Sequence, residues 1–597
     1  MCQVVLLVAD LAEKLGIAII AAIPMKMDQY RTSTSGQARR DHHWREAVLS
    51  ITLPEVLVRG TDKKNQYQYE QLGVLLARRS HILLALWDGQ TEPESSRKLG
   101  GTSDVVRIRQ EGTRRSAGLC RSELFDDADT SLDATGNDPI VRVHTPRASA
   151  ACCGPDLCDA GSVFVLNTAG MQPEYLVHPP GSVPDLLSAA MASTWAPLAA
   201  FNGRIRDFDT SDMSIFRMSK EYLRSTPLPP IPEVLDLTDD LKGFQAAADA
   251  AAQYFQGALL GHFAPANPRP EPKLGRGLFT ALFGRPARLL GMIDRSRSTW
   301  RDHRRRPRLG VVFLFALAIP AIAAIVEWYV HFHGGLTAIF LYLFATLGGL
   351  GYYFGRVEKR EWQNRFQDYR GVAEALRVQL YWGLAAVPRA VSEHYPPRHR
   401  DETAWIKACL RGPSLWALAL ALKLPAPCQQ AVTRGWIQDQ QDYFKKRAAV
   451  HKHSARSSEE WARKFLLAGF FFAFLLLGYE LLDEFKEMTD AKAHLRHILH
   501  EYHKPLEAAA IVSPAIAAAF RISSEYRNHE PHLHAYTAMW AIFGRARVKA
   551  EAIGLHPFES KSASRFQDLV FLTGREALAE NAEWLASHRL RLLEPKP

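Results

Sequence analysis

The amino-acid sequence predicts an α/β N-terminal domain with a parallel sheet, joined to a mostly α-helical membrane region with three to four transmembrane helices. Two observations lead to this fold class. Over residues 1–150, short apolar runs alternate with amphipathic stretches, which is the pattern of buried parallel strands connected by helices. Further along, Leu309–Val326 and Leu336–Phe354 contain no charged residue, and each has roughly the 20 residues that a helix needs to cross the hydrocarbon core.

The predicted strands of the N-terminal domain are short and bounded by polar or turn residues. They are Ile17–Ile23, Glu55–Val58, Ile82–Leu86 and Ile140–Val143. Between the second and the third, Gln66–Arg79 has the apolar spacing of a helix. Strands that alternate with helices in this way favour a parallel sheet.

Two further apolar runs extend the membrane region. Phe465–Leu482 is a third predicted crossing. Ala508–Phe520 is a marginal fourth crossing, because it is apolar but has the shorter length of a core helix or a re-entrant segment. Lys and Arg concentrate on the cytoplasmic side of membrane helices. Arginines crowd residues 301–308 before the first crossing, whereas the link His331–Gly335 has neither Lys nor Arg. Both termini are therefore predicted to be cytoplasmic.

Composition excludes several classes of protein. The 597 residues are 47% hydrophobic, so a wholly disordered chain is excluded, and 7 Cys are too few for a disulfide scaffold. The net charge of +10 suggests an anionic partner. Because the arginine cluster lies directly against a crossing, anionic membrane lipid is a better candidate than nucleic acid, and no nucleic acid is expected. The three thiols of Cys152, Cys153 and Cys158 have no second Cys or His pair at the usual spacing, so neither a metal nor a cofactor is expected.

Changes in composition divide the chain into six segments. The connector after the first domain contains Pro-rich breaks and one predicted helix, Asp239–Leu260. The segments are the α/β domain (1–150), an irregular and helical connector (151–300), a transmembrane hairpin (301–356), a cytoplasmic helical region (357–464), the third and marginal fourth crossings (465–520) and a cytoplasmic helical C-terminal region (521–597).

The candidate site follows the third predicted strand. This strand ends at Asp88-Gly89, and Gly100-Gly101-Thr102 then opens a helix whose first turn contains Asp104. Ligands of open parallel sheets bind at the carboxyl ends of strands, and a glycine-rich helix N-terminus offers backbone N–H groups and a dipole to a phosphate. Asp88 could accept a hydrogen bond from a ribose hydroxyl or a base. The predicted nucleotide-binding residues are Asp88, Gly89, Gly100, Gly101, Thr102 and Asp104.

The order SHILLALWDG, loop, GGTSDVV resembles the SLOG superfamily of Rossmann-like nucleotide-binding domains, as do the upstream LGIAIIAAIPM and YEQLG. The resemblance covers roughly residues 1–150 and implies a Rossmann-like fold and a nucleotide or nucleotide-derived ligand. Hydrolytic members of that superfamily have a Pro-Gly-Gly-x-Gly-Thr-x-x-Glu loop. Here Leu99 precedes Gly100 and no Glu follows at that position, so binding without catalysis is expected. The chain also starts inside the family's first helix, so either the start codon is misassigned or the first phosphate loop is absent.

In this chain the predicted two-helix hairpin is followed by helical, aromatic-bearing segments that contain VAEALRVQLYW and WIQDQQDYF. This arrangement is similar to the SLATT group of bacterial membrane effectors. This likeness implies a nucleotide sensor coupled to a membrane effector in the inner membrane of a bacterium, with a role in conflict or antiviral signalling. The Gly348-Gly349-x-Gly351 run would let hairpins pack closely, so a homo-oligomer is expected. Two alternatives stay open, a membrane-tethered nucleosidase or phosphoribohydrolase that uses Asp104 or Asp88, and a non-catalytic membrane adaptor.

Overall fold

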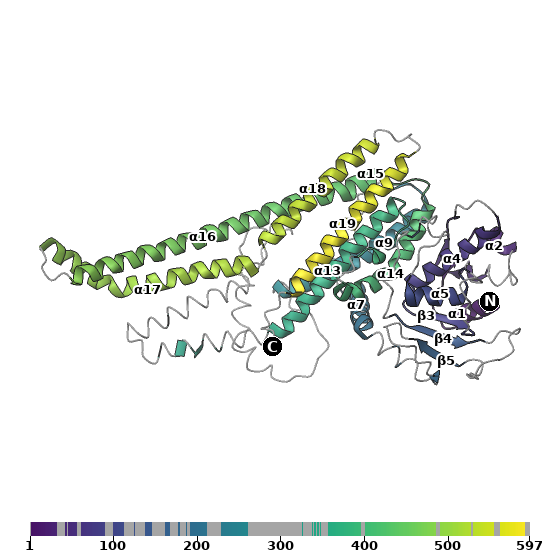
Figure 1. Cartoon of the computed structure of the whole chain (residues 1–597), viewed down its shortest axis with the longest axis horizontal. Coiled ribbons are helices and arrows are strands. Elements are labelled where there is room, and N and C mark those ends of the chain that lie inside the picture. Colours follow the sequence, from purple (N-terminus) through teal and green to yellow (C-terminus); the bar gives the residue numbers. More distant parts are fainter. Residues whose placement is uncertain are drawn as a thin grey trace. The chain divides into compact units, whose positions relative to one another are not determined.

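A computed structural model gives the structure of the chain, whose helices and strands are drawn in Figure 1. The chain divides into two compact units. The first comprises Met1–Tyr254, Arg365–Asp439 and Phe543–Pro597, and the second comprises Phe255–Asn364 and Gln440–Ile542. The structure describes residues 2–32, 42–44, 46–56, 61–89, 99–112, 124–125, 138–145, 162–166, 177–178, 192–211, 228–260, 356–395, 400–484, 490–526, 529–554 and 561–590, with a few single residues between 185 and 347.

The N-terminal part of the first unit contains two small sheets. Strands β1 (Ile20–Ile23) and β2 (Leu49–Thr52) form a parallel pair, with Ile20 opposite Leu49. The second sheet has the order β3-β4-β5-β6, in which β3 and β4 are parallel and the other two pairs are antiparallel. The expectation of a purely parallel sheet is therefore corrected to a mixed one. Its strands are β3 (Leu83–Trp87), β4 (Ile140–His144), β5 (Val163–Leu166) and β6 (Val177–His178).

The predicted helix Gln66–Arg79 lies within α4, whereas one predicted strand is displaced. The strand of this stretch is β2, which ends at Thr52. Glu55 and Val56 lie outside it because the chain leaves the ladder at Pro54, which has no N–H to donate, and Leu57 and Val58 lie outside the described residues. The Gln68 side chain replaces the ladder, since its Oε1 accepts the Val56 N–H at 2.7 Å. The helices of this part are α1 (Cys2–Lys14), α2 (Met27–Thr32), α4 (Thr61–Arg79) and α5 (Thr102–Glu111).

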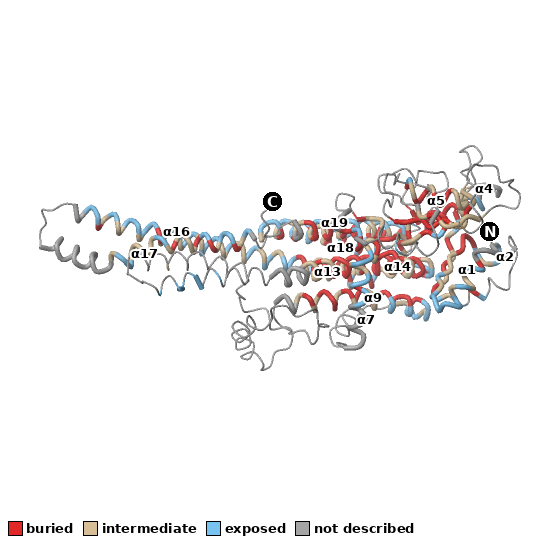
Figure 2. The backbone as a smooth tube through the Cα atoms, turned by 90° about the horizontal axis from the view of Figure 1, so that it is seen from below, coloured by how far each residue is buried: buried red, intermediate tan, exposed pale blue. Residues whose placement is uncertain are grey.

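The rest of the first unit is helical and has an aromatic core. Phe201 of α7 lies 5.0 Å from Tyr369 of α13 and 6.0 Å from Trp405 of α14, measured between ring centres. Buried residues accordingly concentrate on α13 and α14 (Figure 2). The elements that lie wholly in the first unit are α7 (Ala192–Ser211), η5 (Val391–Glu393), α14 (Arg400–Lys423), α15 (Gln429–Val432), η7 (Thr433–Gln438) and α19 (Ser562–Leu590). Three helices belong partly to each unit, α9 (Pro232–Leu260), α13 (Arg356–Leu384) and α18 (His529–Gly554).

The element η7 is a π-helical turn held by aromatic packing. Its Trp436 is 1% exposed and stacks on Tyr381, with ring centres 5.6 Å apart and planes 9° apart. The Tyr381 hydroxyl donates a hydrogen bond of 2.8 Å to the Gly435 carbonyl. The wider turn thus places its large side chain in the core of the first unit.

The second unit contains the long helices α16 (Asp439–Glu484) and α17 (Asp490–Tyr526), which run side by side in Figures 1 and 2. They approach closely where Gly469 faces Pro514, since a Cβ on Gly469 would lie 2.8 Å from the Pro514 ring. Phe520 stacks on Phe465 at 6.0 Å between ring centres. The small residue and the aromatic pair together hold the two helices.

Two helical stretches of the described chain are long and apolar enough to cross a membrane, Gln429–Leu481 and His503–Gly554. Only 11% and 22% of their most apolar windows are buried. Exposed residues instead run along α16, as the pale blue of its tube in Figure 2 shows. Among its large apolar side chains, Phe470 and Phe474 are 67% and 72% exposed. An exposed run of this kind favours contact with lipid over a soluble core.

The predicted crossings divide between described and undescribed residues. The third, Phe465–Leu482, lies in α16, and the marginal fourth, Ala508–Phe520, lies in α17. The hairpin formed by Leu309–Val326 and Leu336–Phe354 lies outside the described residues apart from single helical positions, and the glycine run within it lies outside them entirely.

Candidate functional site

The N-terminus of α5 is formed as the sequence predicts. Gly101 is its N-cap, with φ −71° and ψ 162°, and no side chain caps the helix there. α5 is the next element after β3, and its Arg109 donates to the His81 carbonyl just before that strand begins, so the first turn of α5 lies toward the carboxyl end of β3. The uncapped backbone N–H groups and the helix dipole favour an anion at this end.

Gly100 has a packing role that the sequence did not predict. Its φ is +73°, and a Cβ there would lie 2.2 Å from the carbonyl carbon of Tyr69 in α4. Gly73 of α4 faces the same place, where a Cβ would lie 3.5 Å from the Gly100 Cα. The two glycines let α4 and the start of α5 touch through their backbones. Gly100 is thus needed for helix packing whether or not a ligand binds.

Asp104 supports the same turn. Its side chain is 2% exposed, and Oδ2 accepts the Gly100 N–H at 2.9 Å. Its other oxygen accepts a hydrogen bond of 3.1 Å from Arg107 Nη2. Both carboxylate oxygens therefore have partners within the fold, which is the arrangement of an acidic residue that fixes a helix start.

Asp88 and Gly89 both contact the guanidinium of Arg142, which was not among the predicted site residues. The Arg142 guanidinium of β4 donates a hydrogen bond of 3.0 Å to the Asp88 carbonyl. Gly89 has φ +86°, and a Cβ there would lie 2.2 Å from Arg142 Nη2. Only a residue without a side chain therefore leaves room for this guanidinium at the end of β3.

The Arg142 side chain is held in place by aromatic rings. Its Cζ lies 4.7 Å from the centre of the Phe164 ring and 5.4 Å from that of Trp87. Arg142 is 8% exposed, and its Nε is buried without a hydrogen bond in the described part of the chain. The structure pairs no carboxylate with this guanidinium among the described residues. A charge in the middle of the apolar run IVRV was the signal that could have identified it.

The N-terminal part of the first unit, which contains both sheets and is called the α/β part here, contacts α14 through buried charged side chains. Arg411 of α14 donates to the Asp138 carboxylate and, at 3.0 Å, to the Ser80 carbonyl. Arg109 of α5 lies 3.7 Å from the same carboxylate and donates to the His81 carbonyl at 2.8 Å. Burial lowers the pKa of Arg109 to about 10, against the opposing effect of Asp138.

A second ion pair joins α4 to η5. Glu393 lies 3.2 Å from Arg78 and 3.4 Å from Arg79. Burial alone would raise the pKa of Glu393, but the two guanidinium groups outweigh burial and lower it. Helices α4 and α5 are therefore both tied to the helical part of the first unit, although no sequence motif marks these contacts.

Comparison with known proteins does not assign the chain to a family. No family model matches it, and no curated protein or solved structure matches at the level taken as significant. The likeness to the SLOG and SLATT groups therefore rests on the sequence motifs alone, and function is argued from the site.

Proposed function

We propose that the chain is a membrane-anchored sensor of a nucleotide or nucleotide derivative, and that ligand binding acts on a membrane effector formed by its helical region. The proposed location is the inner membrane of a bacterium, with both termini in the cytoplasm. The proposed binding residues are Asp88, Gly89, Gly101 and Thr102 together with Arg142, while Gly100 and Asp104 shape the turn.

The observation that carries this proposal is the Arg142 guanidinium at the end of β3. It is nearly buried, fixed between Phe164 and Trp87, and without a paired carboxylate among the described residues. A guanidinium in such surroundings favours a bound anion, and phosphate suits its planar set of donors. The uncapped start of α5 follows β3 in the chain and offers a second group of donors to an anion.

The docking of the α/β part on α14 supports signal transmission. Asp138 contacts both Arg109 of α5, the helix whose N-terminus would hold the phosphate, and Arg411 of α14. A shift of α5 on ligand binding would change these buried charges directly. The exposed apolar side chains of α16 support the membrane part of the proposal.

The site is tested by nucleotide binding to the full chain in detergent. Fluorescent N-methylanthraniloyl derivatives of ATP, ADP and AMP serve as probes. We expect saturable binding of at least one probe and at least a tenfold loss in Arg142→Met, since a charge-assisted contact contributes about 1.5–3 kcal/mol. Lys561→Met removes the same charge from an exposed side chain and should bind within twofold of the unaltered protein. Absence of saturable binding, or equal affinity in both variants, would reject the sensor.

An enzyme is the second candidate, and the same proteins separate it from the sensor. Asp104 is the acid nearest the predicted phosphate position, but its two oxygens already bind Gly100 and Arg107. This arrangement favours a structural role. Release of free base from unlabelled nucleotides by the unaltered protein, lost in Asp104→Asn while binding persists, would establish the nucleosidase instead.

A further inference from the structure

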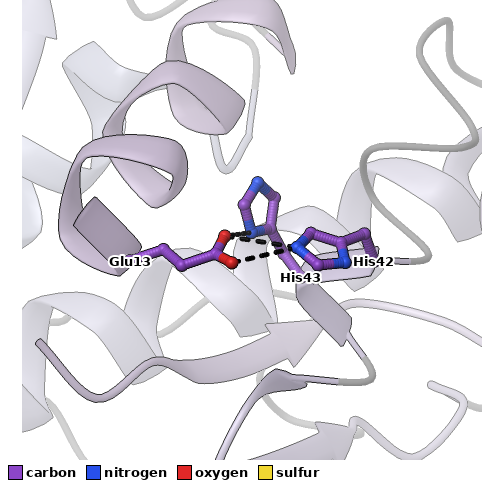
Figure 3. Close-up of side chains that lie close together, drawn as sticks. All are labelled: Glu13, His42 and His43. Atoms are coloured by element: carbon purple, nitrogen blue, oxygen red, sulfur yellow. Dashed lines mark hydrogen bonds and ion pairs between the residues drawn. The ribbon is translucent and has the colours of Figure 1, made fainter. Parts of the chain in front are cut away.

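Three side chains with metal-binding atoms converge in the N-terminal part of the first unit (Figure 3). Glu13 comes from the last turn of α1, and His42 and His43 come from a helical turn that precedes β2. The Nε2 atom of His42 lies 3.1 Å and 3.2 Å from the two oxygens of Glu13. One ligand atom from each residue can be chosen so that all three lie within 4.8 Å of one another.

His43 gives the strongest indication of a missing cation. Its side chain is 7% exposed, and Nε2 lies 2.7 Å from Oδ1 of Asp10. Since an ionised carboxylate only accepts, Nε2 is the ring nitrogen that donates to Asp10, and Nδ1 is left for a second partner. Nδ1 is buried without a hydrogen bond in the described part of the chain, and it lies 3.6 Å from the Glu13 carboxylate. A proton on Nδ1 or a metal ion would bridge Nδ1 and this carboxylate, and only the metal ion would also bind His42, which lies at the same carboxylate.

We propose that Glu13, His42 and His43 bind a divalent transition-metal ion, with zinc as the best fit, and that Asp10 orients His43 for it. Two imidazoles and one carboxylate are a ligand set that zinc uses with water in the fourth position. Ligand atoms at zinc distances in a tetrahedron are about 3.3 Å apart, close to the distance between His42 and Glu13. A metal-bound histidine that donates its other N–H to a carboxylate is the usual arrangement around zinc.

The charges and the chain connectivity fit this assignment. Zinc with the Glu13 carboxylate and two neutral imidazoles has a net charge of one, which Asp10 balances. The ion would join α1 to the turn before β2, two segments that are 29 residues apart at His42 and Glu13. Because a metal that binds only the folded chain stabilises it, zinc would fix α1 against the strand that follows the turn.

The proposal is tested with the full chain, purified in detergent without a polyhistidine tag and stripped of metal with a chelator. Zinc affinity is measured by competition with a chromophoric chelator, and one equivalent of cobalt is added in a parallel sample. We expect one tight zinc per chain and a cobalt spectrum with the visible bands of low-coordinate Co²⁺. His42→Ala and Glu13→Gln, both at exposed side chains, should each weaken zinc binding by more than about 100-fold, beyond the 10–100-fold that outer partners contribute.

Two further variants separate a built site from adventitious binding by other histidines. Asp10→Asn keeps all three ligands and should weaken zinc by about 10–100-fold through the loss of orientation. Glu46→Gln changes an exposed acid a few residues from His43 and should leave affinity unchanged. Equal zinc affinity in His42→Ala, Glu13→Gln and Glu46→Gln would overturn the proposal and leave these residues as ion pairs only.

Discussion

The Asp138 carboxylate between two arginines is the contact whose loss should most weaken the docking of the α/β part. Asp138 accepts from Arg411 and lies 3.7 Å from Arg109, and the three side chains are 12%, 9% and 0% exposed. Asp138→Asn keeps the shape but removes the negative charge, so two guanidinium groups stay buried without their counterion. Breaking a buried pair in this way costs about 3–5 kcal/mol. Because Asn can still accept one hydrogen bond, we expect the lower end, about 3 kcal/mol.

This loss is measurable by pulse proteolysis of the detergent-solubilised chain in urea. With a slope of about 2 kcal/mol per molar urea, 3 kcal/mol lowers the midpoint for the first unit by about 1.5 M. Arg411→Met and the double variant complete a mutant cycle. The double variant should be more stable than the sum of the single changes predicts, since removal of Arg411 also removes half of the unbalanced charge.

Two results would refute this reasoning. One is additivity of the two substitutions within about 0.5 kcal/mol, which would mean that Asp138 and Arg411 do not interact in the folded protein. The other is a loss of less than about 1 kcal/mol in Asp138→Asn, which is the value of an exposed pair and would mean that water reaches the carboxylate.

Three further predictions concern packing, pH and membrane insertion. Gly100→Ala should destabilise the first unit by at least about 2 kcal/mol in urea, since a side chain there has an unfavourable positive φ and collides with the α4 backbone. As the control, Gly243→Ala in α9 should stabilise by up to about 1 kcal/mol, because a Cβ there meets nothing within 4 Å. Burial raises the pKa of Glu580 to about 7 from 4.5, so the folded chain holds a proton that the unfolded chain has lost between these values, and stability falls as pH rises through 7. Glu580→Gln should therefore remove this slope and stabilise by about 1–3 kcal/mol at pH 8 but not at pH 4, in urea titrations at both pH values. The chain should stay in the membrane pellet after alkaline carbonate washing, and its release would contradict insertion of α16.

The sequence predicts the strands whose apolar runs are buried. Leu83–Trp87 and Ile140–His144 form close to where the apolar residues are, and they pair in parallel. Of the strand expected at Glu55–Val58, the described residues Glu55 and Val56 lie outside β2, and the Val56 N–H donates to Gln68 of the later helix α4. This hydrogen bond is a tertiary contact, and nothing in the local sequence pattern indicates it.

The turn at the start of α5 was predictable from the sequence, but the contacts of the charged side chains around the candidate site were not. The glycines and Asp104 mark the start of α5 in the sequence, yet only the fold shows that Gly100 packs against α4 and that Asp104 is engaged. In the sequence Arg142 is one polar residue in a predicted strand, and its contact with Phe164 depends on the pairing of β4 with β5. The contact between Arg411 and Asp138 joins residues 273 positions apart, which no local signal can indicate.

The π-helical turn η7 has a mechanical consequence for the helix that follows. The elements α15, η7 and α16 follow one another without a break. A π-helical turn holds one residue more than an α-helical turn, so a change of η7 to α geometry would pass this surplus residue into α16. Everything beyond would rotate by about 100° about the helix axis and advance by about 1.5 Å. The hydroxyl of Tyr381 on the Gly435 carbonyl opposes this rotation, so events in the helical core could wind or unwind α16. Tyr381→Phe removes this restraint and should favour the wound state, whereas deletion of Gln438 removes the surplus residue and should leave the helix beyond unrotated. The labelling of single cysteines placed along Phe470–Leu477 would show whether the exposed apolar side of α16 has turned.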